Sequence, residues 1–161
     1  MSMIGAMDNE DHSYLEVMDA LAQHGAFPSR DREILWRRIV FSILISNTDD
    51  HLRNHGFLYV TGKGWELSPA YDLNPTPEEI HPRVLRTKID YDDATASLDL
   101  AFAVAEEFGL KTKKAKEIAR EVGVAVSQWR GIAQSLGISA SEIERMRSAF
   151  EHRDLRQAAS L

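Results

Sequence analysis

Hydrophobic positions recur at helical spacing in the first 46 residues. Between residues 11 and 24 apolar side chains repeat every three or four positions, and Gly25 then provides a stop. A second apolar face, which includes Trp36, Ile39 and Ile43, runs through residues 30–46 (RDREILWRRIVFSILIS). The pattern predicts two amphipathic helices, and it assigns the Trp36 stripe to the core.

The periodicity changes in the middle of the chain. The short apolar segments GFLYV and WELS are separated by TGKG, and together they predict a β-hairpin from Gly56 to Ser68, because glycine supplies the backbone that a tight turn needs. Prolines at positions 69, 75, 77 and 82 predict that the following segment is irregular.

Helical spacing returns from about Ser97. It predicts a helix over residues 97–109, a longer one over residues 112–137 with Trp129 in the core, and a third over residues 139–150. Ser139 and Glu142 form a capping box at the start of the third helix. We therefore expect a mainly α domain with a small β-hairpin.

Composition narrows the class of protein. The chain has 161 residues, of which 43% are hydrophobic, so residues 1–161 are expected to form a single folded domain. It has no cysteine, which excludes disulfides and thiolate chemistry. The net charge of −6 without a basic block argues against direct nucleic-acid binding, and no apolar run is long enough to span a membrane. The start of the chain does not resemble a signal peptide, so we expect a cytoplasmic protein.

The candidate chemistry lies in and after NTDDHLRNHGFL. Phosphoryl transfer needs an acidic group that receives the hydroxyl proton and oxygen ligands that hold Mg²⁺ on the nucleotide phosphates. Asp49 and Asn54 have the D-x-x-x-x-N spacing of a kinase catalytic loop, and Asp72 follows the predicted hairpin, where a second metal-binding aspartate is expected. Asp50 is one position too close to Asn54, so Asp49 is the better candidate for the base.

Some polar residues in and near this segment also have a purely structural interpretation. Asp50 is expected to be a turn or capping residue, since aspartate is common there. His51 and His55 have a spacing that binds zinc on a helix, but the surrounding glycines and prolines indicate a loop, and we discount a zinc site. The acidic segment DYDDATASLD lacks the pattern of a calcium loop and reads as a solvated turn before a helix capped by Ser97.

The motifs ILISNTDDHLRNHGFL and GWELSPAYDLNP resemble the HipA-like serine/threonine kinases, the toxin kinases of bacterial toxin–antitoxin pairs. The resemblance extends into the later helices, and it implies the C-terminal lobe of a protein-kinase-like fold that uses ATP and Mg²⁺. It implies that Asp49 is catalytic and that Asn54 and Asp72 are metal ligands. The implied nucleotide-binding residues are His51, Leu52, Arg53, Asn54, Tyr71 and Asp72.

The same resemblance implies partners. Members of the family phosphorylate a serine of a protein substrate, in the best-known cases an aminoacyl-tRNA synthetase, and are neutralised by a HipB-like DNA-binding antitoxin. The phosphate-holding parts of a kinase, a Gly-rich loop and a strand lysine, precede the catalytic loop. Here the first lysine is Lys63, so we expect a C-terminal lobe that is inactive without an N-terminal lobe, as a fragment, a truncated product or half of a split kinase.

Two other functions remain open from the sequence. A small-molecule phosphotransferase of the aminoglycoside or choline kinase type uses a similar loop, although ISNTDDH and SPAYDLNP favour the HipA-like reading. The third hypothesis is that the chain is a non-catalytic binding module derived from a kinase lobe. The intact set of Asp49, Asn54 and Asp72 argues against it, because a lobe used only for binding needs no metal site.

Overall fold

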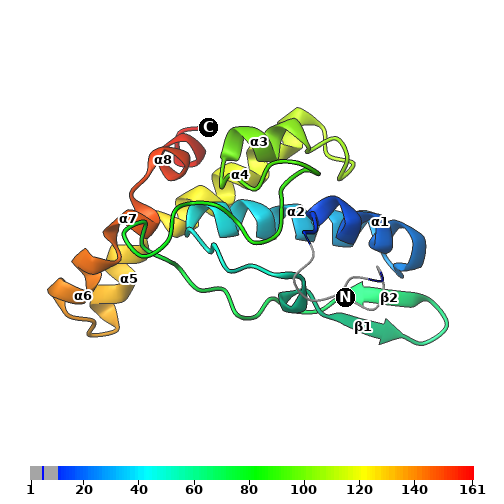
Figure 1. The fold of residues 1–161 in the computed structure, drawn as a ribbon, viewed down its shortest axis with the longest axis horizontal. Helices are drawn as coiled ribbons and strands as arrows, with labels where there is room; N and C mark the ends of the chain where they lie inside the picture. Colours follow the sequence, from blue (N-terminus) through cyan, green and yellow to red (C-terminus); the bar gives the residue numbers. More distant parts are fainter. Residues whose placement is uncertain (1–4, 6–10) are drawn as a thin grey trace.

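A long central helix, α2, organises the structure. The computed structural model describes residue 5 and residues 11–161. In this part of the chain α2 packs against α1, α3, α4, α8 and strand β2 (Figure 1). The elements are α1 (Tyr14–His24), α2 (Pro28–Leu44), the 3₁₀ helix η1 (Leu52–Asn54), β1 (Phe57–Val60), β2 (Gly64–Leu67), α3 (Leu98–Ala103), α4 (Thr112–Val126), α5 (Trp129–Ser135), α6 (Ala140–Arg145), α7 (Arg147–Phe150) and α8 (Arg153–Ala159).

The core lies on the apolar face of α2 that the periodicity predicts. Trp36, Ile39 and Ile43 are completely buried there, which confirms the predicted stripe. The indole nitrogen of Trp36 donates a hydrogen bond to the carbonyl of Ala101 at 3.2 Å. Since a buried indole N–H without a partner is costly, this bond fixes α3 against the middle of α2.

The hairpin forms where the glycines predict it. β1 and β2 pair antiparallel, with Phe57 opposite Leu67 and Val60 opposite Gly64. Gly62 in the turn has a φ of +72°, a left-handed conformation that favours glycine. The buried carboxylate of Asp31, in the first turn of α2, accepts a hydrogen bond from the Leu67 backbone N–H at 3.0 Å, which ties the hairpin to α2.

The C-terminal helices differ from the sequence prediction in three places, one of which is that the helix expected over residues 139–150 is two helices, α6 and α7, separated at Met146. α3 ends at Ala103, and turns continue to Gly109. The helix expected over residues 112–137 is two helices, α4 and α5, separated at residues 127–128. The Ser127 hydroxyl donates to the Gly123 carbonyl at 2.7 Å, a side-chain bond that competes with the helical ladder and accompanies the break.

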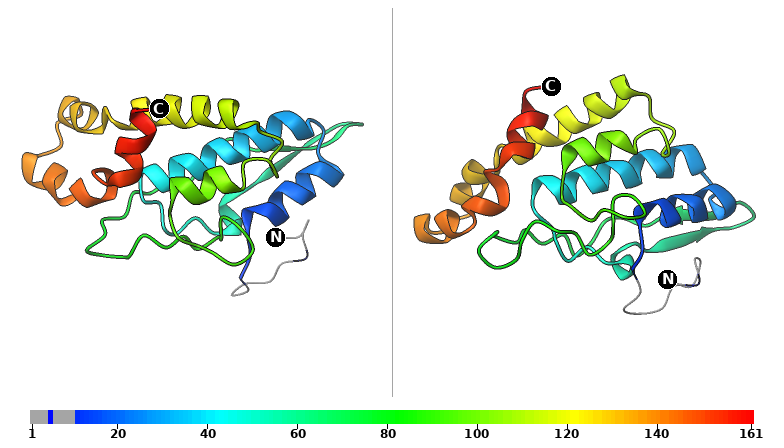
Figure 2. Two further views of the ribbon diagram at one scale, coloured as in Figure 1. Left: turned by 90° about the horizontal axis from the view of Figure 1, so that it is seen from above. Right: turned by 45° about the horizontal axis from the view of Figure 1, so that its top comes forward.

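Local caps hold the helix starts as predicted. The Ser97 hydroxyl accepts a hydrogen bond from the Leu100 backbone N–H at 3.3 Å, so Ser97 caps α3. The capping box of Ser139 and Glu142 begins α6. Figures 1 and 2 show that α5, α6 and α7 form one end of the molecule and that the hairpin forms the other.

The irregular segment after the hairpin is fastened by Arg83. Its guanidinium donates to the Ile43 carbonyl at 3.0 Å, to the Ser46 hydroxyl at 3.1 Å and to the Asp154 carboxylate at 2.8 Å. Asp154 also accepts from the Leu98 backbone N–H at 2.8 Å. A single cation therefore joins the end of α2, the loop that follows it and the start of α8.

The described part of the chain is mainly helical with one two-stranded antiparallel hairpin, which confirms the coarse fold class. Among the described residues, none of the helices combines the length and the apolar character that crossing a bilayer requires.

Candidate functional site

The loop that follows α2 separates the two adjacent aspartates. Asp49 is exposed, whereas Asp50 has a relative exposure of only 1%. The loop begins at Ser46, whose φ of 54° turns the chain sharply out of the helix. Its hydroxyl donates to the Ala149 carbonyl at 2.9 Å, and its carbonyl accepts from the Thr76 backbone N–H at 3.1 Å. These contacts hold the turn against two distant segments.

Asp50 is the centre of a buried polar cluster, and this corrects its interpretation as a turn residue. Its carboxylate accepts hydrogen bonds from the Tyr14 hydroxyl at 2.5 Å and from the Ser42 hydroxyl at 3.2 Å. The Nε2 atom of His55 lies 3.1 Å from the other carboxylate oxygen, within ion-pair distance but without the alignment of a hydrogen bond. The Thr87 hydroxyl donates to the Asp50 carbonyl at 2.7 Å.

The cluster shifts the pKa values of its members. Burial alone would raise the pKa of Asp50, but contacts with His55, Tyr14 and Ser42 outweigh it and lower the pKa below its usual value. Burial first, and then the charge of Asp50, raise the pKa of Tyr14 well above its usual value. Tyr14 therefore remains a donor and Asp50 an acceptor near neutral pH, and their hydrogen bond lies in the protein interior.

Asn54 lies at the end of η1 and faces back toward the loop. Its side-chain amide donates to the Asp49 carbonyl at 3.4 Å, and only 6% of Asn54 is exposed. Leu52 belongs to the hydrophobic core, so its side chain is not available to a ligand. His51 is half-buried and Arg53 is exposed.

The segment with Asp72 approaches η1 directly. The hydroxyl of Tyr71 donates to the Arg53 carbonyl at 2.6 Å, which joins the residues next to Asp72 and Asn54. Asp72 is exposed and has a φ of 57°, a conformation that is unusual outside glycine and clusters at functional sites. The Asn74 side-chain amide donates to the Asp72 carboxylate at 2.7 Å and so orients it.

The donor set around η1 suits a hard cation. Asn54 and Asp72 offer amide and carboxylate oxygens, and Mg²⁺ is commonly bound through one or two carboxylates together with substrate phosphates and water. Within the described ranges no three histidine or acidic side chains gather as a metal cluster. Asn54 and Asp72 therefore offer oxygen donors of the kind that Mg²⁺ takes, and they do so without an all-protein cluster in this part of the chain.

Sequence reasoning missed several supporting residues. Arg38 on α2 donates to the Ser68 carbonyl at the end of the hairpin, and burial lowers the pKa of its guanidinium. Asn47 accepts from the Asn74 backbone N–H at 3.3 Å, which places the Asp72 segment over the loop. Asn47 stands in the quoted motif, but Tyr14 and Thr87 lie far from it in sequence, and no local pattern marks them.

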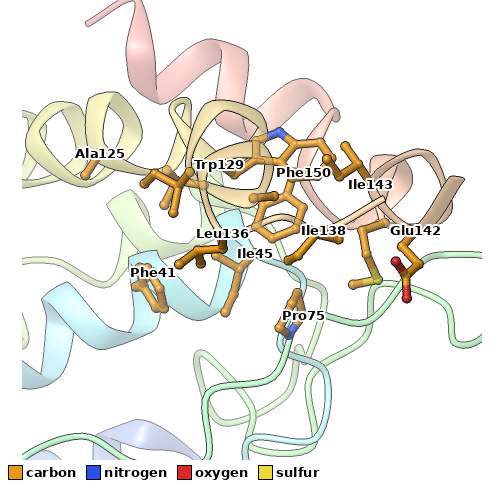
Figure 3. Close-up of a pocket in the computed structure, with 14 residues that line it drawn as sticks. Phe41, Ile45, Pro75, Ala125, Trp129, Leu136, Ile138, Glu142, Ile143 and Phe150 are labelled. Atoms are coloured by element: carbon orange, nitrogen blue, oxygen red, sulfur yellow. The ribbon is translucent and has the colours of Figure 1, made fainter. Parts of the chain in front are cut away.

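Two pockets lie close to these elements. One, of about 500 Å³, is lined by Asp49 and by parts of the segment between residues 76 and 86. The other, of about 580 Å³, contains none of the predicted site residues and lies between the end of α2 and α5–α7 (Figure 3). Trp129 lines this second pocket and is only half-buried, so its assignment to the core is wrong: α5 has no buried residue.

Comparison with curated proteins gives partial matches to kinases by name. A Haemophilus influenzae protein named "Putative kinase" is 35% identical over 86 residues, which cover 51% of this chain and 25% of that protein. A Sinorhizobium fredii protein named "Putative kinase Y4dM" is 52% identical over 40 residues, or 25% of this chain and 10% of that protein. The matched part thus spans a quarter or less of either relative.

A solved structure shares the fold. It is a chain from the Shewanella oneidensis MR-1 toxin–antitoxin complex of HipA, HipB and operator DNA, with a TM-score of 0.64 and 19% identity. The match covers 97% of this chain and 37% of that one. The family model described as the HipA-like C-terminal domain matches residues 1–129, and the chain therefore belongs to the HipA-like C-terminal domain family.

Proposed function

We propose that this chain is the catalytic lobe of a HipA-type serine/threonine protein kinase. The observation that carries the proposal is the different burial of Asp49 and Asp50, the two adjacent aspartates in the loop after α2. Asp49 is exposed and its carboxylate makes no ion pair or hydrogen bond within residues 11–161, whereas Asp50 is buried and anchors the loop. An exposed, unpaired carboxylate on an anchored loop is suited to receive a proton from a bound hydroxyl.

Each residue has a defined part in the proposed reaction. The acceptor serine oxygen forms a bond to the γ-phosphorus of ATP, the bond to the ADP oxygen breaks, and Asp49 takes the hydroxyl proton. Asn54 and Asp72 would hold Mg²⁺, which when bound neutralises charge on the phosphates. The Tyr71 hydroxyl supports this arrangement, because its bond to the Arg53 carbonyl ties the two ligand-bearing segments together.

The proposal includes a second lobe. Phosphoryl transfer depends on groups that clamp the β- and γ-phosphates, and the chain corresponds to 37% of the solved HipA-complex chain that it matches. We therefore assign the phosphate clamp to an N-terminal lobe outside this lobe, on the same polypeptide or on a separate subunit. A HipB-like antitoxin is the proposed regulatory partner, and a protein serine, in an aminoacyl-tRNA synthetase by family resemblance, is the proposed acceptor.

The test is a phosphorylation assay on the complete kinase, this lobe together with its phosphate-binding lobe, with labelled ATP and Mg²⁺. Asp49→Asn should lower turnover by roughly 10²–10⁴-fold, the usual contribution of a general base, and should leave the melting temperature unchanged. Asp72→Asn should instead weaken Mg²⁺-dependent nucleotide binding. Asp92→Asn, an exposed carboxylate in the turn before α3, is the matched control and should retain activity. Full activity in Asp49→Asn would refute the assignment of the base.

A further inference from the structure

A pocket of about 500 Å³ opens directly beside Asp49. Thr48 and Asp49 form one wall of it. The other wall comes from the irregular segment after Asp72 and includes Ile80, Val84 and Arg86. The proposed base therefore faces a recess that is large enough for a few side chains of another molecule.

Hydrogen bonds fix the second wall relative to the loop of Asp49. The Arg86 backbone N–H donates to the Thr48 carbonyl at 2.9 Å, and the Thr76 backbone N–H donates to the Ser46 carbonyl at 3.1 Å. The hydroxyl of Thr87 adds the bond to the Asp50 carbonyl at 2.7 Å. Both ends of this wall are thus hydrogen-bonded to the loop. These bonds fix the position of the Arg86 backbone relative to the loop that carries Asp49.

The lining of the pocket combines apolar side chains with a cation that lacks a partner. Ile80 is 74% exposed and Val84 is 45% exposed, so both present apolar surface to the opening. The Arg86 side chain is exposed and forms no ion pair or hydrogen bond with any residue in the described part of the chain. Asp49, the carboxylate in the lining, does not lie within ion-pair distance of it. An unpaired guanidinium is a ready donor to a carboxylate from outside.

We propose that this pocket is the acceptor site and that it selects a protein segment in which the phosphorylated serine is flanked by an apolar and an acidic side chain. The apolar side chain packs on Ile80 and Val84, and the acidic one binds Arg86. Repulsion from Asp49 keeps the acidic side chain on the Arg86 side of the pocket. The inference rests on the proposed kinase function, because it names the substrate chemistry of that site.

Three serine peptides with the same apolar neighbour test the charge preference, with glutamate, glutamine or lysine as the other neighbour. The complete kinase should phosphorylate the glutamate peptide about 10-fold more efficiently than the glutamine peptide, as expected for one charge-assisted hydrogen bond. Arg86→Glu should reverse the order and favour the lysine peptide, and Arg86→Gln should abolish the preference. Arg120→Glu, an exposed arginine on α4 outside the pocket, makes the same charge change and should keep the wild-type order.

Binding provides a readout that does not need turnover. Fluorescence anisotropy of the labelled peptides on the Asp49→Asn kinase should show the same preference, and adding Arg86→Glu should remove it. If no peptide is phosphorylated but the glutamate peptide binds through Arg86, the acceptor site stands and the proposed reaction fails. If phosphorylation depends on Asp49 but Arg86→Glu leaves the preference unchanged, the site is refuted and the reaction stands. If Arg86→Glu lowered the phosphorylation of all three peptides equally and raised the KM for ATP, Arg86 would be a nucleotide-binding residue. This result would also overturn the proposal.

Discussion

Protonation of His152 should destabilise the fold between neutral and mildly acidic pH. His152 is the N-cap of α8, and its ring lies in the interior with a relative exposure of 9%. The Nε2 atom lies 3.2 Å from the Leu44 carbonyl, to which it donates, and Nδ1 accepts from the Leu155 backbone N–H at 3.4 Å. This pattern requires the neutral ring, because a proton on Nδ1 would remove the acceptor that caps α8.

The pKa gives the direction and size of the effect. Burial, and then the nearby charge of Arg83, lower the pKa of His152 to about 4, although Asp154 acts in the opposite direction. In the unfolded chain the ring has a pKa of about 6.5, so the unfolded state binds more protons between these values. Stability is therefore complete above pH 6.5 and falls as the pH drops toward 4. At 1.36 kcal/mol per pKa unit the total loss is about 3 kcal/mol, of which about 2 kcal/mol is reached at pH 5.

Urea unfolding at pH 7.5 and pH 5.0 measures the difference. The wild-type free energy of unfolding should fall by about 2 kcal/mol between the two values. His152→Gln should start lower at pH 7.5, because the cap is altered, but should lose much less on acidification. His24→Gln, at the exposed end of α1, is the matched control and should keep the wild-type difference. A wild-type protein equally stable at both pH values, or a His152→Gln variant as pH-dependent as wild type, would refute the reasoning.

Three further substitutions test the packing and the buried cluster. In Gly123→Ala the new methyl carbon would lie 2.8 Å from backbone and side-chain atoms of Ala158 on α8, so thermal or urea unfolding should show a loss of about 1–3 kcal/mol. Gly131→Ala on α5 meets nothing within 4 Å and should gain up to about 1 kcal/mol from helix propensity; a gain at both positions would contradict the close approach of α4 and α8. Asp50→Ala removes the acceptor of Tyr14 and leaves His55 buried opposite an empty site, which should cost about 3–5 kcal/mol in urea unfolding. A loss below 1 kcal/mol would show that Asp50 does not anchor the loop.

The sequence by itself determined the elements that depend on local patterns. The apolar repeat around Trp36 specifies α2 because residues three and four apart share one face of a helix. Gly62 specifies the hairpin turn because few other residues adopt its backbone conformation without strain. The sequence also predicted that Asp49 and Asn54 precede the hairpin and that Asp72 follows it, because the spacing of a loop and the position of a hairpin are local properties.

Only the tertiary structure decided how neighbouring residues divide their roles. Asp49 and Asp50 are chemically identical and adjacent, yet one is exposed and the other is buried against Tyr14, Ser42 and Thr87. These partners come from three separate parts of the chain, so no local pattern could reveal them. Trp129 has helical spacing typical of a core residue, but its ring stacks on Phe150 of α7 at 4.5 Å between ring centroids, beside an open pocket, and stays half-buried. Periodicity fixes which face of a helix is apolar, whereas the path of the rest of the chain decides what covers that face.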